Sequence, residues 1–219
     1  MDGTHLELDW QGRRLGLDSP LVGRFNVENL TAALAAGLAL GCDAEACCAA
    51  LAAVPQVPGR LERLSLPNGA IAVVDYAHTH DALAAVLGAC RELTDGRLLA
   101  VFGCGGDRDR GKRPLMGAVV ARDADLAWIT SDNPRGEEPA SICVQIAEGF
   151  AAQPDPRARL SRVVVDRRSA IHEALAAALP GDIVIVAGKG HEDYQLVGDR
   201  RLDFDDRQVI RDWVREQGA

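Results

Sequence analysis

Between residues 60 and 190, short apolar runs alternate with longer stretches in which apolar side chains recur every three to four positions. The first pattern is typical of strands buried in a parallel sheet, and the second is typical of helices that cover such a sheet. We expect strands at residues 71–75, 97–102, 125–130, 162–165 and 183–187, and helices at residues 81–93, 114–122, 139–152 and 167–179. A hairpin at residues 194–204 and a terminal helix from Asp205 to Val214 complete the expected elements. Crossovers of this length are right-handed, so the pattern predicts an α/β fold, a doubly wound, Rossmann-like and mostly parallel sheet with helices on both faces.

The beginning of the chain follows a different pattern. Residues 4–22 alternate between apolar and polar side chains, which predicts a hairpin. Ala-rich helices are expected at residues 26–40 and 43–53, after which prolines interrupt the periodicity. We therefore expect two domains, residues 1–55 and residues 56–219.

The loops that follow the expected strands are rich in glycine and in charge. In an open parallel sheet, ligands bind beyond the carboxyl ends of the strands, so these loops should form one shared rim. Two of the loops are residues 132–135 (Asp-Asn-Pro-Arg) and residues 188–192 (Gly-Lys-Gly-His-Glu). The planar fork of Arg135 is suited to a carboxylate, and Glu192 offers a carboxylate to an ammonium. Together they favour a site for the head group of an amino acid.

Each of these two segments also has an ordinary explanation. Asp-Asn-Pro is a common turn sequence, in which Pro134 fixes φ. Glycines permit tight turns, and a single histidine such as His191 is more often structural than catalytic. Residues 188–192 also lack the spacing of a phosphate loop and do not open a helix. Both interpretations stay open at this point.

The glycine-rich turn at residues 103–108 invites a dinucleotide interpretation. Arg108, however, stands where the dinucleotide fingerprint requires a third glycine. A nicotinamide enzyme is therefore disfavoured, and Arg108 is interpreted as an anion-binding side chain at the rim.

Polar side chains near two expected helix starts have competing explanations. His78 and His80, with the aspartates beside them, could be metal ligands, but polar capping explains them as well, and we predict no metal site. Asn26 and Asn29 stand three positions apart at a helix start, where capping is the simpler explanation.

Composition narrows the class of function. A net charge of −8 argues against a nucleic-acid surface, which requires concentrated Lys and Arg. The six cysteines have neither Cys-x-x-Cys nor metal-site spacing, which predicts buried free thiols in a reducing compartment. No signal peptide and no long uncharged apolar run occurs, so we expect a cytoplasmic protein that binds no membrane. We expect a monomer.

Seven segments together resemble the Mur ligase family, in particular the C-terminal part of those members that add meso-diaminopimelate. The segments are residues 23–30 (Gly-Arg-Phe-Asn-Val-Glu-Asn-Leu), 58–62 (Pro-Gly-Arg-Leu-Glu), 75–79 (Asp-Tyr-Ala-His-Thr), 103–114, 132–135, 166–171 (Asp-Arg-Arg-Ser-Ala-Ile) and 188–192. Each segment alone is a weak signal. Their occurrence in the family's order over nearly the whole chain makes the resemblance specific.

The resemblance implies ATP-dependent synthesis of an amide bond. In that family ATP, with Mg²⁺, phosphorylates the D-glutamyl carboxylate of UDP-MurNAc-L-Ala-D-Glu, and the amine of meso-diaminopimelate then displaces the phosphate. The Asp-Asn-Pro-Arg signature marks the diaminopimelate enzymes. Diaminopimelate carries a distal carboxylate that lysine lacks, so an arginine paired with that carboxylate would disfavour lysine. Residues 1–55 would then be the end of a central ATP-binding domain, and residues 56–219 the C-terminal domain that binds the incoming amino acid.

The resemblance also assigns residues to ligands. The residues implied to hold diaminopimelate are Arg108, Asp132, Asn133, Pro134, Arg135, Gly188 and Glu192. The residues implied to contact ATP are Asn26, Asn29, Arg60, Asp75 and His78. No catalytic residue and no metal ligand is assigned within these residues.

The chain departs from the family pattern in two respects. His80 replaces the proline that usually follows His78 and Thr79, which should loosen the turn. No Gly-x-x-Gly-Lys-Ser/Thr loop and no UDP-binding region occurs in the 219 residues, so we expect the chain alone not to catalyse the ligation. The alternatives are a non-catalytic amino-acid-binding module and a lysine-adding or folylpolyglutamate-type ligase. The Asp-Asn-Pro-Arg segment disfavours both of these ligases.

Overall fold

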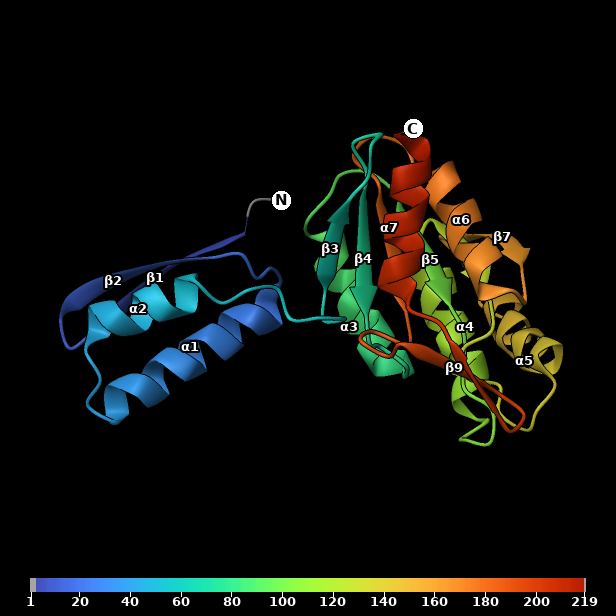
Figure 1. Ribbon diagram of the computed structural model, residues 1–219, viewed down its shortest axis with the longest axis horizontal. Helices are drawn as coiled ribbons and strands as arrows, with labels where there is room; N and C mark the ends of the chain where they lie inside the picture. The colour runs from blue at the N-terminus through green and yellow to red at the C-terminus, as the bar shows by residue number, and fades with distance from the viewer. Residues whose placement is uncertain (1–2, 219) are drawn as a thin grey trace. The chain divides into compact units, whose positions relative to one another are not determined.

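The computed structural model describes residues 3–218, which form two compact units divided between Val57 and Pro58. Residues 1, 2 and 219, at the outer ends of the two expected domains, lie outside the described residues. Each unit has its own helices and strands (Figure 1). Each also has its own apolar core.

The first unit is a hairpin with two helices. Its elements are β1 (Thr4–Trp10), β2 (Arg13–Ser19), α1 (Arg24–Ala39) and α2 (Ala44–Ala52), as the sequence predicts. The hairpin pairs antiparallel, and its Leu15 packs with Leu34 of α1 and Ala44 of α2. Asp43 caps α2 by accepting a hydrogen bond from the amide of Ala46 at 2.9 Å.

The second unit is a six-stranded sheet in the order β3-β4-β8-β5-β6-β7, covered by helices. The strands are β3 (Glu62–Ser65), β4 (Ile71–Asp75), β5 (Leu98–Phe102), β6 (Leu126–Ile129), β7 (Arg159–Val163) and β8 (Ile183–Ala187). The helices are α3 (His80–Arg91), α4 (Lys112–Asp123), α5 (Pro139–Ala151), α6 (Arg167–Ala177) and α7 (Asp206–Gln217). A separate hairpin consists of β9 (Tyr194–Val197) and β10 (Arg200–Asp203). All strands from β4 to β8 pair in parallel, which confirms the predicted fold class.

The central strands are apolar throughout because both faces of the sheet are covered. Every residue of β5 and of β8 is buried. Alternate side chains of these strands, such as Val101 and Val186, pack in one cluster with Ile171 of α6 and Ile210 of α7. Helices α3, α4 and α5 pack together and cover the other face (Figure 1). This two-sided burial explains the continuous apolar runs in the sequence.

Two edge strands differ from the sequence expectations. β7 occupies Arg159–Val163 instead of residues 162–165, because an edge strand needs fewer apolar side chains and its pairing with β6 contains a bulge between Ala127 and Trp128. The short strand β3 was not predicted. It pairs antiparallel with β4 at the opposite edge and has a single aliphatic side chain, Leu64.

Candidate functional site

A cavity of about 420 Å³ lies where β4, β5, β6 and β8 end. Loops after all four strands contribute to its wall, which is the shared rim that the sequence predicts. The loop after β7 does not line it: Asp166 there caps α6 and Arg167 is buried. The lining residues are Tyr76, His78, Thr79, Gly105, Arg108, Asp109, Lys112, Asp132, Asn133, Arg135, Gly188 and Glu192.

Charges of both signs face this cavity. Arg108, Lys112 and Arg135 contribute cationic groups, whereas Asp132 and Glu192 contribute carboxylates. Arg135 and Glu192 come from different loops, after β6 and after β8, and both line the same wall. The arrangement can therefore bind a small molecule that carries a carboxylate and an ammonium.

Arg135 is held in place mainly by its backbone. Its amide donates to the carbonyl of Leu196 at 3.0 Å, and its carbonyl accepts from the amide of Gly198 at 2.7 Å, which fixes a φ of +52°. Its Nη1 donates to the carbonyl of Gly106 at 2.9 Å. Among residues 3–218, Nε and Nη2 of Arg135 make no hydrogen bond, so these two donors remain for a ligand. A Cβ at Gly105 would come within 2.8 Å of Nη1, so a larger residue there would displace the Arg135 guanidinium.

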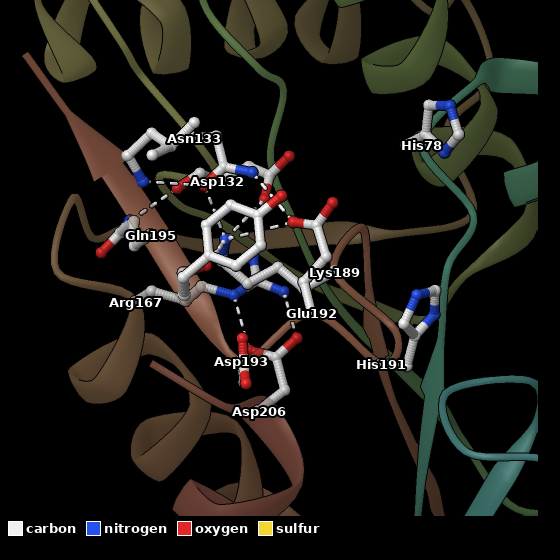
Figure 2. A network of polar contacts seen from close by, with 12 residues as sticks. His78, Asp132, Asn133, Arg167, Lys189, His191, Glu192, Asp193, Gln195 and Asp206 are labelled. Carbon is white, nitrogen blue, oxygen red and sulfur yellow. Dashed lines mark hydrogen bonds and ion pairs between the residues drawn. The ribbon is translucent and has the colours of Figure 1, made fainter. Parts of the chain in front are cut away.

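Asn133 connects the two loops through its side-chain amide. Its Nδ2 donates to Oε2 of Glu192 at 3.0 Å, and its Oδ1 accepts from the Nζ of Lys189 at 2.9 Å. Figure 2 shows Asp132, Asn133 and Glu192 converging on Lys189, while His78 and His191 lie apart from this network. Burial lowers the pKa of Lys189, and the carboxylate of Asp132 counteracts that shift.

The glycine-rich loop after β5 is tied to the loop after β6. Arg113 is fully buried and forms two hydrogen bonds to the Glu137 carboxylate, at 2.8 and 3.0 Å. The amide of Asp107 donates to the same carboxylate at 2.7 Å. Arg113 is the largest of the influences that lower the pKa of Glu137 to about 2. Arg108, by contrast, is exposed at the rim, where it can meet an anion.

A second buried ion pair supports the floor of the site. Arg167 and Asp206 are both fully buried, and two hydrogen bonds of 2.7 and 2.8 Å join them. Arg167 also donates to the carbonyl of Ala187, the last residue of β8, at 3.0 Å. The pair therefore links α6, α7 and the end of β8.

Of the residues assigned to diaminopimelate, Pro134 is the one that does not line the cavity, and Asp75, which is assigned to ATP, does not line it either. Pro134 supports the loop, since its carbonyl accepts from the amide of Glu137 at 3.0 Å. The buried Asp75 carboxylate accepts from the backbone amides of Leu61 at 2.9 Å and Ala77 at 2.8 Å. Burial raises the pKa of Asp75, while these amides oppose the shift. Its geometry shows a role in shaping the loop after β4.

Aromatic and basic side chains gather beside the cavity. The Arg60 guanidinium lies 5.0 Å from the centre of the Tyr76 ring, and the rings of Tyr76 and His78 are 4.8 Å apart. His191 lies 5.5 Å from the Tyr76 ring. His80, which the sequence analysis expected to loosen the turn, is the first residue of α3, and Thr79 caps that helix by accepting from the amide of Ala82. The cap is intact without proline.

Asn26 and Asn29 belong to the first unit. Both lie within α1, whose N-cap is Gly23, so neither is the cap that the simpler explanation expected. Nδ2 of Asn26 donates to the carbonyl of Val22 at 2.8 Å. Nδ2 of Asn29 donates to Oδ1 of Asn26 at 3.5 Å.

Several residues in the cavity wall or directly behind it were missed by the sequence analysis. Lys189 stood inside an assigned segment, but only its neighbours Gly188 and Glu192 received roles. Thr79, Asp109 and Lys112 also stood inside segments that resemble the family, but none of them was assigned a role. A lysine flanked by two glycines directly after a buried strand is the one signal that could have indicated Lys189.

No group of three or more His, Cys, Asp or Glu within residues 3–218 is arranged to hold a metal ion. No helix in the described part of the chain is both long and apolar enough to cross a membrane. Of the six cysteines, all free, Cys90, Cys104 and Cys143 are buried, whereas Cys42 is exposed.

Comparison with protein families gives a match over residues 59–190, to the family described as "Mur ligase, glutamate ligase domain". A curated relative from Synechocystis sp. is 50% identical over 196 residues, which is 89% of this chain and 38% of the relative. That relative is named UDP-N-acetylmuramoyl-L-alanyl-D-glutamate–2,6-diaminopimelate ligase.

Two solved structures extend the comparison. A structure of a UDP-N-acetylmuramoyl-L-alanyl-D-glutamate–2,6-diaminopimelate ligase is 41% identical and matches 100% of this chain and 44% of its own, with a TM-score of 0.73. The Mycobacterium tuberculosis folylpolyglutamate synthase, solved with ADP and AMPPCP, is 26% identical over 86% of this chain and 43% of its own, with a TM-score of 0.63. The chain spans about two fifths of the length of the relatives it matches.

Proposed function

This chain belongs to the Mur ligase family, and we propose that it forms the acceptor-binding part of an ATP-dependent ligase that adds meso-diaminopimelate to UDP-MurNAc-L-Ala-D-Glu. Pro58–Ala219 would bind the incoming amino acid. Met1–Val57 would be the end of the ATP-binding domain. We propose a cytoplasmic monomer, acting on small molecules and on neither nucleic acid nor membranes.

One observation carries the proposal: Arg135 and Glu192, from two separate loops, line one cavity. The free Nε and Nη2 of Arg135 suit the distal carboxylate of diaminopimelate. Glu192 and Asp132 suit the distal ammonium. Arg108, exposed at the rim, would meet a further carboxylate of the ligand. Asn133 and Gly188 would shape the wall around these groups.

The same geometry would discriminate against lysine. Lysine has the distal ammonium but no distal carboxylate, so the Arg135 donors would lose their partner on binding. A charged hydrogen bond contributes about 1.5–3 kcal/mol. Its loss corresponds to a preference of about 10- to 100-fold.

In the proposed reaction, ATP is a substrate whose γ-phosphoryl group passes to the D-glutamyl carboxylate. The amine of diaminopimelate then forms the C–N bond, the C–O bond to phosphate breaks, and the amine loses a proton. This chain's residues hold and orient the amine. Arg60 and His78 would approach the nucleotide beside the Tyr76 ring. Asp75 would hold both of their segments, through the amides of Leu61 and Ala77. The resemblance to the family also assigns Asn26 and Asn29 to ATP.

Mg²⁺ accompanies ATP in the family, but the described residues do not offer a cluster of ligands for it. No step is therefore assigned to a metal held by this chain.

A chimera tests the proposal. The 219 residues replace the matching region of the Synechocystis relative, and ADP release is measured with ATP, UDP-MurNAc-L-Ala-D-Glu and either meso-diaminopimelate or L-lysine. We expect diaminopimelate to be preferred by kcat/KM at least about tenfold, and the preference to fall in Arg135→Ala. Arg122→Ala is the matched control, because Arg122 is exposed and pairs with Asp123. Equal use of both amino acids would contradict the proposal, as would ADP release from the 219 residues alone.

A further inference from the structure

Lys189 is a lysine without access to solvent. Its side chain is 0% exposed, although lysine is among the residue types least often buried. It stands between Gly188 and Glu192, two residues of the cavity wall, yet it does not line the cavity itself. Burial of an ammonium is costly unless it is paired and hydrogen-bonded, so its surroundings indicate what it does.

The ammonium has three protons, and the structure provides hydrogen-bond acceptors for two of them and an ion-pair partner beside them. Nζ donates to Oδ1 of Asn133 at 2.9 Å and to the carbonyl of Tyr194 at 2.8 Å. It also forms an ion pair with Oδ1 of Asp132 at 3.3 Å, and that oxygen makes no hydrogen bond among the described residues. Figure 2 shows Lys189 at the centre of this group.

Two donors point at the same oxygen of Asn133. Oδ1 accepts from Lys189 and also from the backbone amide of Leu196 at 3.0 Å. If the Asn133 amide were flipped, its NH₂ group would face two donors and its oxygen would face the Glu192 carboxylate. The chemistry of the neighbours therefore fixes one orientation, in which Nδ2 donates to Oε2 of Glu192.

The ammonium also balances charge beneath the cavity. Asp132, Glu192 and Asp206 are the carboxylates that act on Lys189, and Arg167 is the other cation. With Lys189 charged, this group carries one net negative charge, which suits a single ligand ammonium. Without Lys189 the group would carry two net negative charges.

We propose that Lys189 is a positioning residue: its buried ammonium sets the orientation of the Asn133 amide, and through that amide it holds the Glu192 carboxylate ready for the ligand's ammonium. The consequence for the ligand rests on the proposed function. The positioning of Asn133 does not, and it can be tested without any ligand.

The chain offers a matched control, because it contains two lysines, Lys112 and Lys189. Lys112 lines the cavity but donates to the carbonyl of His78 and does not contact Asn133. The side-chain NH₂ resonances of Asn133 are assigned in the full chain by their loss in Asn133→Ala. We expect Lys189→Met to move these resonances and Lys112→Met to leave them in place. Unchanged resonances in a folded Lys189→Met would overturn the proposal.

A measurement on the unaltered chain applies even if Lys189→Met does not fold. With ¹⁵N-lysine and ¹³C-asparagine labels, we expect a slowly exchanging ammonium signal of Lys189 with a scalar coupling across the hydrogen bond to Cγ of Asn133. A Lys189 ammonium that exchanges as fast as that of Lys112 would contradict the proposed contact.

Calorimetry with meso-diaminopimelate tests the consequence. We expect Lys189→Met to weaken binding at least about tenfold, and to have less than about a twofold effect when Asn133→Ala is already present, because Lys189 acts through Asn133. Additive effects, or unchanged binding in Lys189→Met, would overturn the inference. If the unaltered chain binds no diaminopimelate while the resonances of Asn133 move as expected, the proposed substrate is wrong and the positioning role stands.

Discussion

The side-chain amide of Asn133 donates to the carboxylate of Glu192 across 3.0 Å, although 59 positions separate the two residues in the sequence. This contact joins the loop after β6 to the loop after β8 above the parallel sheet. It uses Oε2 of Glu192, and Oε1 makes no hydrogen bond among the described residues. One carboxylate oxygen is thus fixed by the protein and the other is available to a ligand, which is the arrangement that a preorganised ammonium site requires.

Removing one member of the buried pair Arg167–Asp206 should destabilise the fold much more than removing both members. Removing one partner leaves an uncompensated buried charge, so Arg167→Met should lower the free energy of unfolding by about 3–5 kcal/mol. The double variant Arg167→Met/Asp206→Leu removes both charges and should recover most of that loss. Urea unfolding of the three proteins measures this. A loss below about 1 kcal/mol in the single variant would show that the pair is not isolated from water.

The ionisation of Glu137 should make the free energy of unfolding depend on pH in the acidic range. Its pKa is lowered from 4.5 to about 2, mainly by hydrogen bonds from Arg113. When the pKa of a carboxyl is lower in the folded state than in the unfolded state, its ionisation stabilises the folded state. That stabilisation is complete when the pH is above the unfolded pKa, and it is lost as the pH falls from about 4.5 toward about 2. Glu137→Gln should therefore flatten the pH dependence of the unfolding free energy in that range. Glu148→Gln, which removes an exposed carboxylate from α5, is the control. An equal slope in Glu137→Gln and the unaltered protein would refute this assignment.

The cysteines should react according to burial. Burial raises the pKa of Cys90 and Cys104 to about 12 and of Cys143 to about 11, and the thiolate is the reactive form. In folded protein at pH 8, iodoacetamide should modify the exposed Cys42 and spare these three, whereas all six should react in urea. Peptide mass spectrometry distinguishes the sites. Modification of Cys90 as fast as Cys42 without denaturant would mean that the core opens readily.

His80→Pro should stabilise the second unit. His80 is the first residue of α3, where proline is favoured because its missing N–H is not needed. Thr79 has φ −127° and ψ 160°, which suits a residue before proline. We expect the unfolding free energy to rise by about 0.4–1 kcal/mol relative to His80→Ala, which removes the imidazole without constraining the backbone. A less stable proline variant would show that the start of α3 cannot accept the ring.

The sequence predicted the parallel sheet because strands buried on both faces, such as β5 and β8, are apolar without interruption. It located β7 poorly and missed β3, since edge strands such as these can remain partly polar. The glycines beside Lys189 mark its loop in the sequence, but its role could not be predicted from them, because that role arises from Asn133, Asp132 and the Tyr194 carbonyl, which meet only after folding. A motif identifies the loop, but the loop's neighbours decide which of its side chains face the cavity.

The most direct test of the account is calorimetric titration of the 219-residue chain with meso-diaminopimelate and with L-lysine, in the unaltered protein and in Arg135→Ala. The free donors of Arg135 predict that diaminopimelate binds about 10- to 100-fold more tightly than L-lysine. In Arg135→Ala the two affinities should lie within a few-fold of each other. A preference that survives Arg135→Ala unchanged, or lysine binding as tight as diaminopimelate binding in the unaltered chain, would contradict the account.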